Sequence, residues 1–140
     1  MSIFTQVQQR EFPGHFVWED DLCFSIMTIA PIRRGHLLVI PNQEVDHWDD
    51  VPEKTAAHLM LVSQRIAKAM KAVIPCKRIG ISVIGLEVPH THIHLLPIDQ
   101  MADMDFTLAK EMPTTTLAET AVDIRTVLLE QGYLEASIRK

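Results

Sequence analysis

Three histidines alternate with other residues in one short segment of the chain. His90, His92 and His94 lie within the run Pro-His-Thr-His-Ile-His-Leu-Leu-Pro. Alternate residues of a β-strand point to the same face, so we expect the three imidazoles to form a row with steps of about 6.6 Å, estimated from the rise per residue. Ile93 and Leu95 then point to the opposite face and can be buried. Three basic, hydrogen-bonding rings on one rigid face are typical of a site for an anion or a metal ion.

Covalent catalysis and metal binding are the two chemistries that such a row favours. A neutral imidazole is a competent nucleophile towards phosphorus, and the central ring of His92 has one neighbour to orient it and one to donate to a phosphate oxygen. His90 and His94 are about 13 Å apart by backbone rise, too far for all three rings to reach one ion without distortion. We therefore predict catalysis without a metal or other cofactor. A zinc-dependent hydrolase, and a row of merely solvated or core-satisfied histidines, remain as alternatives.

Composition limits the classes of protein that remain. The chain has 140 residues, of which 47% are hydrophobic and 22% charged, and its formal net charge is −5. This predicts a single folded domain and argues against broad nucleic-acid binding, which needs a basic surface. We expect no membrane span, because no apolar run reaches ~18 residues, and a cytoplasmic location, because the start of the chain does not resemble a signal peptide. Cys23 and Cys76 lie in apolar stretches and are interpreted as small core residues.

The periodicity predicts an α+β fold with a mainly antiparallel five-stranded sheet, one long helix and a C-terminal helix. Strands are expected over residues 15–19, 22–28, 36–40, 78–84 and 89–96. The long helix should begin near Asp50 as its N-cap and end at Pro75. The second should cover residues 116–131, with a capping box of Thr116 and Glu119. Residues 1–14 are weakly patterned. A single sheet with one helix-covered face can leave an edge or a face for a partner subunit.

Three stretches together resemble the histidine triad (HIT) superfamily. Residues 90–96 match its His-x-His-x-His-x-x motif, residues 18–21 (Trp-Glu-Asp-Asp) resemble its early strand–turn–strand signature, and residues 34–41 resemble its Pro-Gly-His-x-Leu-Val-Ile-Pro stretch. The resemblance covers about residues 15–98. We therefore expect one HIT-like domain over residues 1–140, with a motif-bearing core and a helical extension over about 99–140.

The resemblance implies a nucleotide hydrolase or nucleotidyl transferase that cleaves phosphoramidate or phosphoanhydride bonds. By position, His92 is then the nucleophile that attacks the α-phosphorus of a nucleotide-like small molecule, and water hydrolyses the nucleotidyl-histidine that forms. His94 contacts the phosphate and leaving-group side. His90 and His36 belong to the same hydrogen-bonded cluster, with strand pairing bringing His36 near His90. The resemblance implies no metal and a homodimer.

Several positions depart from the family pattern. Thr28 stands where the family commonly has an acidic residue that binds the ribose hydroxyls, and Glu87 where it commonly has Ser or Thr beside the phosphate. Arg33 and Arg34 could partly compensate by reaching a phosphate. These departures support the alternative function of a nucleotide- or partner-binding module with weak or vestigial catalysis. His15, His47 and His58, which have no patterned partner, are expected at surface or helix-face positions.

Overall fold

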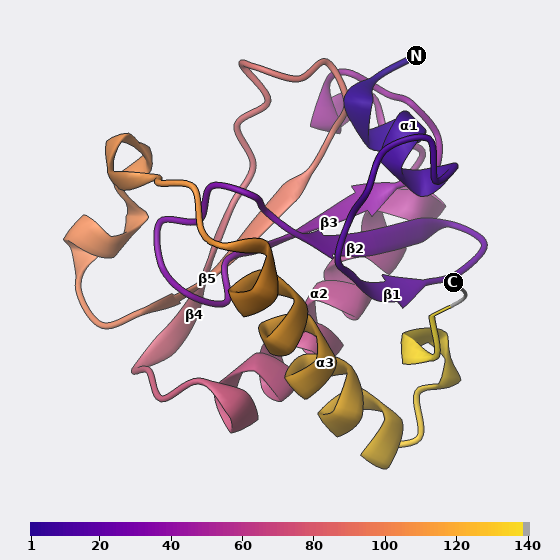
Figure 1. Ribbon diagram of the computed structural model, residues 1–140. Helices are drawn as coiled ribbons and strands as arrows, with labels where there is room; N and C mark the ends of the chain where they lie inside the picture. Colours follow the sequence, from indigo (N-terminus) through magenta and orange to yellow (C-terminus); the bar gives the residue numbers. More distant parts are fainter. Residues whose placement is uncertain (139–140) are drawn as a thin grey trace.

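The computed structural model describes residues 1–138, and its centre is a five-stranded antiparallel sheet (Figure 1). The strands are β1 Phe16–Glu19, β2 Cys23–Met27, β3 Leu37–Pro41, β4 Arg78–Ser82 and β5 Ile93–Ile98. Their spatial order is β1-β2-β3-β5-β4, and every neighbouring pair is antiparallel. The α+β class predicted from periodicity is therefore confirmed.

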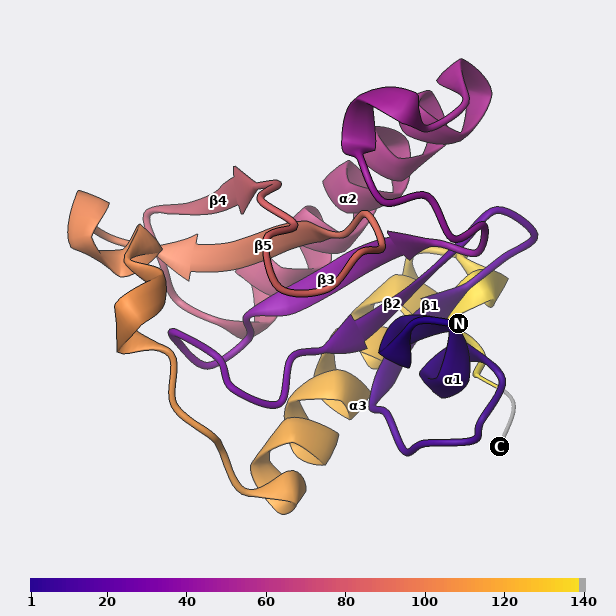
Figure 2. The same cartoon turned by 90° about the horizontal axis from the view of Figure 1, so that it is seen from above.

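Helices lie on both sides of this sheet. They are α1 Ile3–Gln8, α2 Glu53–Val73 and α3 Thr114–Glu130, and short 3-10 turns cover 48–50, 101–104, 106–108 and 134–136. The long helices α2 and α3 pack on one face, whereas α1 lies against the other face beside β1 and β2 (Figure 2). Within residues 1–138, none of the helices combines the length and the hydropathy that a membrane span requires.

Strand alternation divides the core into two clusters. Leu37 and Val39 point towards α2 and α3, whereas Leu38 and Ile40 join Phe4 of α1 on the opposite face. The main cluster also takes the apolar stripes of the two long helices, which include Leu59, Val62, Ile66, Ala69, Met70, Leu117, Ala121, Ile124 and Leu128. This division decides which face of β3 and β5 stays available for polar side chains.

The N-terminal caps predicted for the two long helices are wrong. Helix α2 begins at Glu53 after Pro52, and Asp50 lies in a preceding 3-10 turn rather than at an N-cap. Helix α3 begins at Thr114 after Pro113, so the capping box expected at 116–119 is wrong. Both prolines have φ near −53° (−52° and −54°) with extended ψ of 138°, and neither start has a side-chain cap. The fixed φ of proline, rather than an N-cap hydrogen bond, marks these starts.

Helix α1 was not predicted. It has only six residues, with Phe4 and Val7 buried on one side, and the Ser2 hydroxyl accepts a hydrogen bond from the Thr5 amide at its N-terminus. Two apolar residues are too few to establish a helical period, so the helix is stabilised mainly by its packing on the sheet. The Ser2 N-cap three residues before Thr5 was the one available signal.

Candidate active site

His36 and His94 meet where β3 pairs with β5. Leu38 of β3 is the register partner of His94, and His36 immediately precedes β3 on the same face. Nε2 of His36 lies 2.9 Å from Nδ1 of His94, and the Ile32 amide donates to Nδ1 of His36 over 3.1 Å. Ile93 lies in the main core cluster on the opposite face, as the alternation predicts. Strand pairing therefore brings His36 beside His94, and not beside His90 as the sequence suggested.

His90 and His92 lie outside the strand, contrary to the predicted row. Strand β5 begins only at Ile93, because the Thr91 amide and hydroxyl both bond to the Val45 carbonyl, at 2.7 and 2.8 Å, and hold this segment away from the sheet. The ring of His92 turns back so that its Nδ1 lies 2.7 Å from the His90 carbonyl. The rings of His92 and His94 consequently approach to 4.9 Å between centroids, closer than the expected step.

The hydrogen-bond partners of His36 assign the proton positions on one pair of rings. The Ile32 amide can only donate, so Nδ1 of His36 carries no proton in the neutral ring. The proton is then on Nε2 of His36, which donates to Nδ1 of His94. Neutral His94 consequently carries its own proton on Nε2. This chain of donors makes His94 a hydrogen-bond donor at Nε2.

Backbone carbonyl groups assign the proton positions on the rings of His90 and His92. The His90 carbonyl can only accept, so Nδ1 of His92 carries the proton and Nε2 keeps its lone pair. Nε2 of His90 lies 2.8 Å from the Pro41 carbonyl and donates to it, which leaves Nδ1 of His90 as an acceptor. The hydroxyl of Ser2 lies 2.6 Å from that Nδ1 and donates to it. His90 thus orients the ring of His92 through its backbone carbonyl, and its own ring is held at both nitrogens.

Helix α1 forms one wall of this histidine cluster. The ring of Phe4 meets the rings of His90 and His92 edge to face, with centroids 5.8 and 4.9 Å apart. Ser2 at the helix N-cap holds His90, as described above. Sequence reasoning missed both residues, because nothing in the weakly patterned first 14 residues connects them to a motif some 90 residues later.

Burial keeps all four imidazoles neutral. It lowers the pKa of His36 from 6.5 to about 4, and it lowers the pKa of His94 to about 3, with His36 and His92 adding to the effect. Burial also lowers the pKa of His90 and of His92, although hydrogen bonds to the Pro41 and His90 carbonyls oppose it. At neutral pH the ring of His92 is therefore the unprotonated, nucleophilic form.

A cavity of about 280 Å³ opens beside His92. Trp48, Ile84 and Leu86 line it, and all three are exposed to solvent elsewhere on their surfaces. Glu87 is exposed, and its charge favours the protonated form of His92, which opposes the lowering of the His92 pKa by burial. The surroundings of His92 are thus apolar and acidic rather than basic.

The predicted substrate-binding residues lie in three different environments. Thr28 is half-buried at the end of β2, where its amide donates to the His36 carbonyl, so it is adjacent to the cluster. Arg33 pairs with Asp99 and Asp103 at 3.1 and 2.9 Å, whereas Arg34 bonds to Thr120 and lies 3.7 Å from Asp123. Because carboxylates already balance both guanidinium groups, a phosphate role for the arginines stays a prediction. Glu87, the fourth predicted residue, is exposed and acts on His92 through its charge.

One other group of side chains has metal-ligating atoms within reach of one another. In the described part of the chain, Asp20, Cys23 and His58 place such atoms within 4.8 Å, and the triad histidines form no such group. The Asp20 carboxylate, however, accepts from the Trp18 indole and from His58 on one oxygen, and from the Leu22 and Cys23 amides on the other. Burial raises the pKa of Asp20, but these hydrogen bonds outweigh it and lower the pKa overall. With its acceptor positions occupied, Asp20 anchors the β1–β2 turn to α2.

Comparison with known proteins is consistent with this geometry. The HIT domain family matches residues 9–101. An uncharacterized HIT-like protein of Synechococcus elongatus is 35% identical over 104 residues, which are 68% of this chain and 88% of that protein. The adenosine 5'-monophosphoramidase HNT1 of Saccharomyces cerevisiae is 29% identical over 96 residues, covering 68% and 61%. A zinc-bound histidine triad family protein of Mycobacterium smegmatis superposes with a TM-score of 0.80 at 26% identity, covering 92% and 94%.

Proposed function

The chain belongs to the HIT domain family, and from that membership we propose that it is a hydrolase or nucleotidyl transferase for nucleotide-like phosphate derivatives. His92 is the nucleophile, and the reaction passes through a covalent nucleotidyl-histidine. The observation that carries this proposal is the assignment of the lone pair to Nε2 of His92, since its Nδ1–H is bound by the His90 carbonyl. A buried, neutral imidazole with one fixed N–H and one unshared pair has the form that attack on phosphorus requires.

The proposed reaction has two displacement steps at phosphorus. Nε2 of His92 forms a bond to the α-phosphorus while the bond to the leaving nitrogen or oxygen breaks, and the electron pair leaves with that atom, which takes a proton from water. A second water then attacks the phosphorus, its excess proton passes to solvent, and the bond to Nε2 breaks. His94 donates its Nε2–H to a phosphate oxygen in both steps. The His90 carbonyl stabilises the positive ring of the intermediate, and no step requires a metal.

The phosphoramidate bond is the first substrate class to test. The yeast relative is an adenosine monophosphoramidase, and the acidic environment near His92 disfavours a leaving group that adds further phosphate charge. Adenosine 5'-phosphoramidate is therefore the preferred probe, with a dinucleoside polyphosphate as the phosphoanhydride counterpart.

Replacement of His92 tests the nucleophile. We expect His92→Gly to reduce release of AMP by at least roughly a thousandfold, and added imidazole to restore part of it, because the cavity left by the ring can hold a free imidazole. Acid-quenched protein should carry a mass increase of one nucleotidyl group. Turnover by His92→Gly equal to that of the wild type would exclude the proposal. Loss of activity after exhaustive chelation, restored by zinc, would favour the zinc-dependent alternative.

A nucleotide- or partner-binding module with weak catalysis is the second candidate. Thr28, next to His36, offers one hydroxyl where the two hydroxyls of a ribose need acceptors. The carboxylate of Glu87 acts on His92 and repels a phosphate bound there. Titration calorimetry with AMP and GMP separates the two candidates. Binding without turnover supports the module, and binding with turnover supports the hydrolase.

A homodimer also remains our proposal. Strand β4 forms one edge of the sheet, and Arg78 and Ile81 on it are exposed, as expected of an edge that a second copy covers. Light scattering coupled to size-exclusion chromatography measures the mass in solution and tests it. We further propose a cytoplasmic location and no nucleic-acid or membrane partner.

A further inference from the structure

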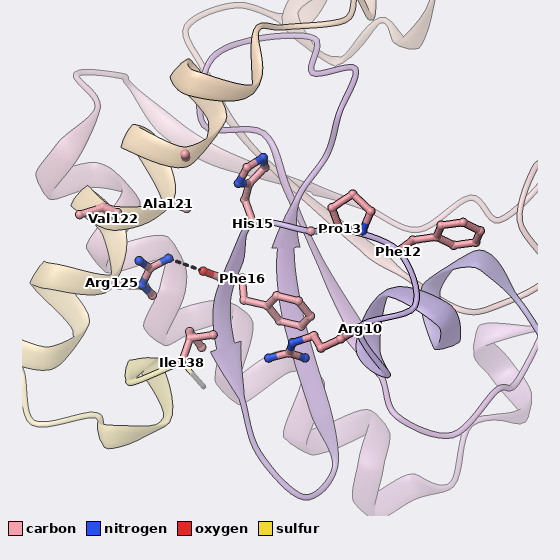
Figure 3. Close-up of a pocket in the computed structure, with 11 residues that line it drawn as sticks. Arg10, Phe12, Pro13, His15, Phe16, Ala121, Val122, Arg125 and Ile138 are labelled. Carbon is pink, nitrogen blue, oxygen red and sulfur yellow. Dashed lines mark hydrogen bonds between the residues drawn. The ribbon is translucent and has the colours of Figure 1, made fainter. Parts of the chain in front are cut away.

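A second cavity, of about 380 Å³, lies away from the triad histidines, between the start of β1 and helix α3 (Figure 3). This volume is within the range of small-molecule sites. Phe12, Phe16, Val122 and Ile138 supply apolar walls, and the side chain of Arg125 reaches from α3 towards the backbone of Phe16. The proposed function uses none of these residues.

Arg125 carries a positive charge that nothing described in the chain balances. Its Nη1 donates to the Phe16 carbonyl over 2.7 Å, and within residues 1–138 no carboxylate pairs with it and its Nε and Nη2 have no hydrogen-bond partner. Arg33 and Arg34, in contrast, each face a carboxylate. Burial lowers the pKa of Arg125, as expected where a guanidinium is desolvated without compensation. Arg125 is half-buried, and a guanidinium edge that faces a cavity without a carboxylate partner is available to an anionic ligand.

The other basic side chains of the cavity do not provide a second free charge. Arg10 pairs with Glu19 at 2.6 Å and lies over the Phe16 ring, 3.7 Å from its centroid, so it serves as part of the wall. Burial lowers the pKa of His15, and Arg125 lowers it further, so His15 is neutral at pH 7. The cavity thus combines one positive charge with an apolar and aromatic lining.

We propose that this cavity binds a monocarboxylate carried on a flat apolar body. The Phe16 carbonyl holds Nη1 of Arg125, which leaves the Nε–Nη2 edge with two parallel N–H groups, the geometry that pairs with the two oxygens of one carboxylate. One guanidinium neutralises one carboxylate, whereas a phosphate dianion needs a second free cation. The apolar body contacts Phe16, Val122 and Ile138, where burial of its surface contributes to affinity.

Titration calorimetry with 2-naphthoate and its uncharged analogue 2-naphthamide tests the proposal on the full chain at pH 7. We expect the acid to bind and the amide to bind at least roughly tenfold more weakly, because a charge-assisted bidentate contact is lost. Arg125→Met should weaken naphthoate binding by a similar factor. The control is Lys68→Met, which removes an exposed positive charge on α2 and should leave the affinity unchanged.

A second variant makes the test independent of any effect of Arg125 on folding. Ala118 lines the cavity from the half-buried surface of α3, so Ala118→Trp fills the cavity while Arg125 remains. This variant should bind 2-naphthoate at least roughly tenfold more weakly with an unchanged melting temperature. Equal binding of acid and amide, wild-type affinity in both variants, or no binding of naphthoate up to about 10 mM would each overturn the proposal.

Discussion

Nε2 of His36 donates to Nδ1 of His94 over 2.9 Å, and this contact connects the entry to β3 with the middle of the sheet. The Ile32 amide fixes the tautomer of His36, and His36 fixes that of His94. In the proposed reaction, the remaining N–H of His94 donates to the substrate. The Ile32 amide, four residues before His36, thus determines through His36 the hydrogen-bonding role of His94, which lies 58 residues after His36.

Replacement of His36 by phenylalanine should separate this positioning role from substrate binding. His36→Phe keeps a ring of similar shape but leaves the Ile32 amide and Nδ1 of His94 without their partner. His94 can then exchange tautomers, so we expect kcat to fall roughly tenfold to a hundredfold with a smaller change in KM, and stability to fall by roughly 1–3 kcal/mol. Steady-state kinetics and urea unfolding measure the two effects. A wild-type kcat would show that the donor chain has no catalytic role.

Replacement of Ser2 tests the link between α1 and the histidine cluster. Ser2→Ala removes the hydroxyl that donates to Nδ1 of His90 and caps α1, so the ring of His90 loses one of its two anchors. We expect kcat to fall roughly threefold to tenfold and stability to fall by about 1 kcal/mol. Thr126→Ala is the control, since its hydroxyl bonds only to the Val122 carbonyl on exposed helix surface. Equal kinetics for the two variants would contradict the positioning role.

Stability should decrease in mild acid because of the buried imidazoles. The pKa of His36 is lowered from 6.5 to about 4 by burial, so the unfolded chain binds a proton at a pH where the folded chain does not. The free energy of unfolding is therefore not reduced by His36 above about pH 6.5, and it decreases as the pH falls from there towards 4. From His36 alone we expect a loss of roughly 2 kcal/mol between about pH 7.5 and about pH 5. Urea unfolding at both pH values measures it.

The variant His36→Phe provides the control for this pH dependence. It lacks the titrating ring, so the difference in unfolding free energy between the two pH values should shrink by about the amount assigned to His36. An undiminished difference in the variant would assign the acid sensitivity to other groups, such as His94, whose pKa is lowered to about 3.

Gly35 lies just before β3, and Gly85 serves as its matched control in a test of the steric contact between residue 35 and Ile74. Both have positive φ, +94° and +76°, but a Cβ on Gly35 would lie 2.1 Å from Cδ1 of Ile74, whereas a Cβ on Gly85 would meet nothing within 4 Å. We expect Gly85→Ala to cost roughly 1–2 kcal/mol and Gly35→Ala to cost roughly 1–3 kcal/mol more. Thermal and urea unfolding measure both, and equal losses would refute the steric contribution of Ile74.

Local patterns in the sequence were sufficient for the sheet but not for its boundaries. Alternation placed Ile93 and Leu95 in the core and left His94 on the other face, because side chains in a strand alternate whatever the strand pairs with. The prediction that this strand begins at residue 89 is wrong, because the Val45 carbonyl holds Thr91 out of the ladder, and no local pattern contains that contact.

Periodicity and motifs in the sequence are sufficient to predict the fold class, the family and the four histidines on which the proposed chemistry rests, because they are properties of neighbouring residues. The folded arrangement is needed to know which rings meet, that Ser2 and Phe4 of α1 contact His90 and His92, and which nitrogen of His92 keeps a lone pair. The physical reason is that proton positions and ring orientations follow from hydrogen-bond partners and burial. Partners such as Ser2 and Pro41 reach the rings only when distant segments pack together.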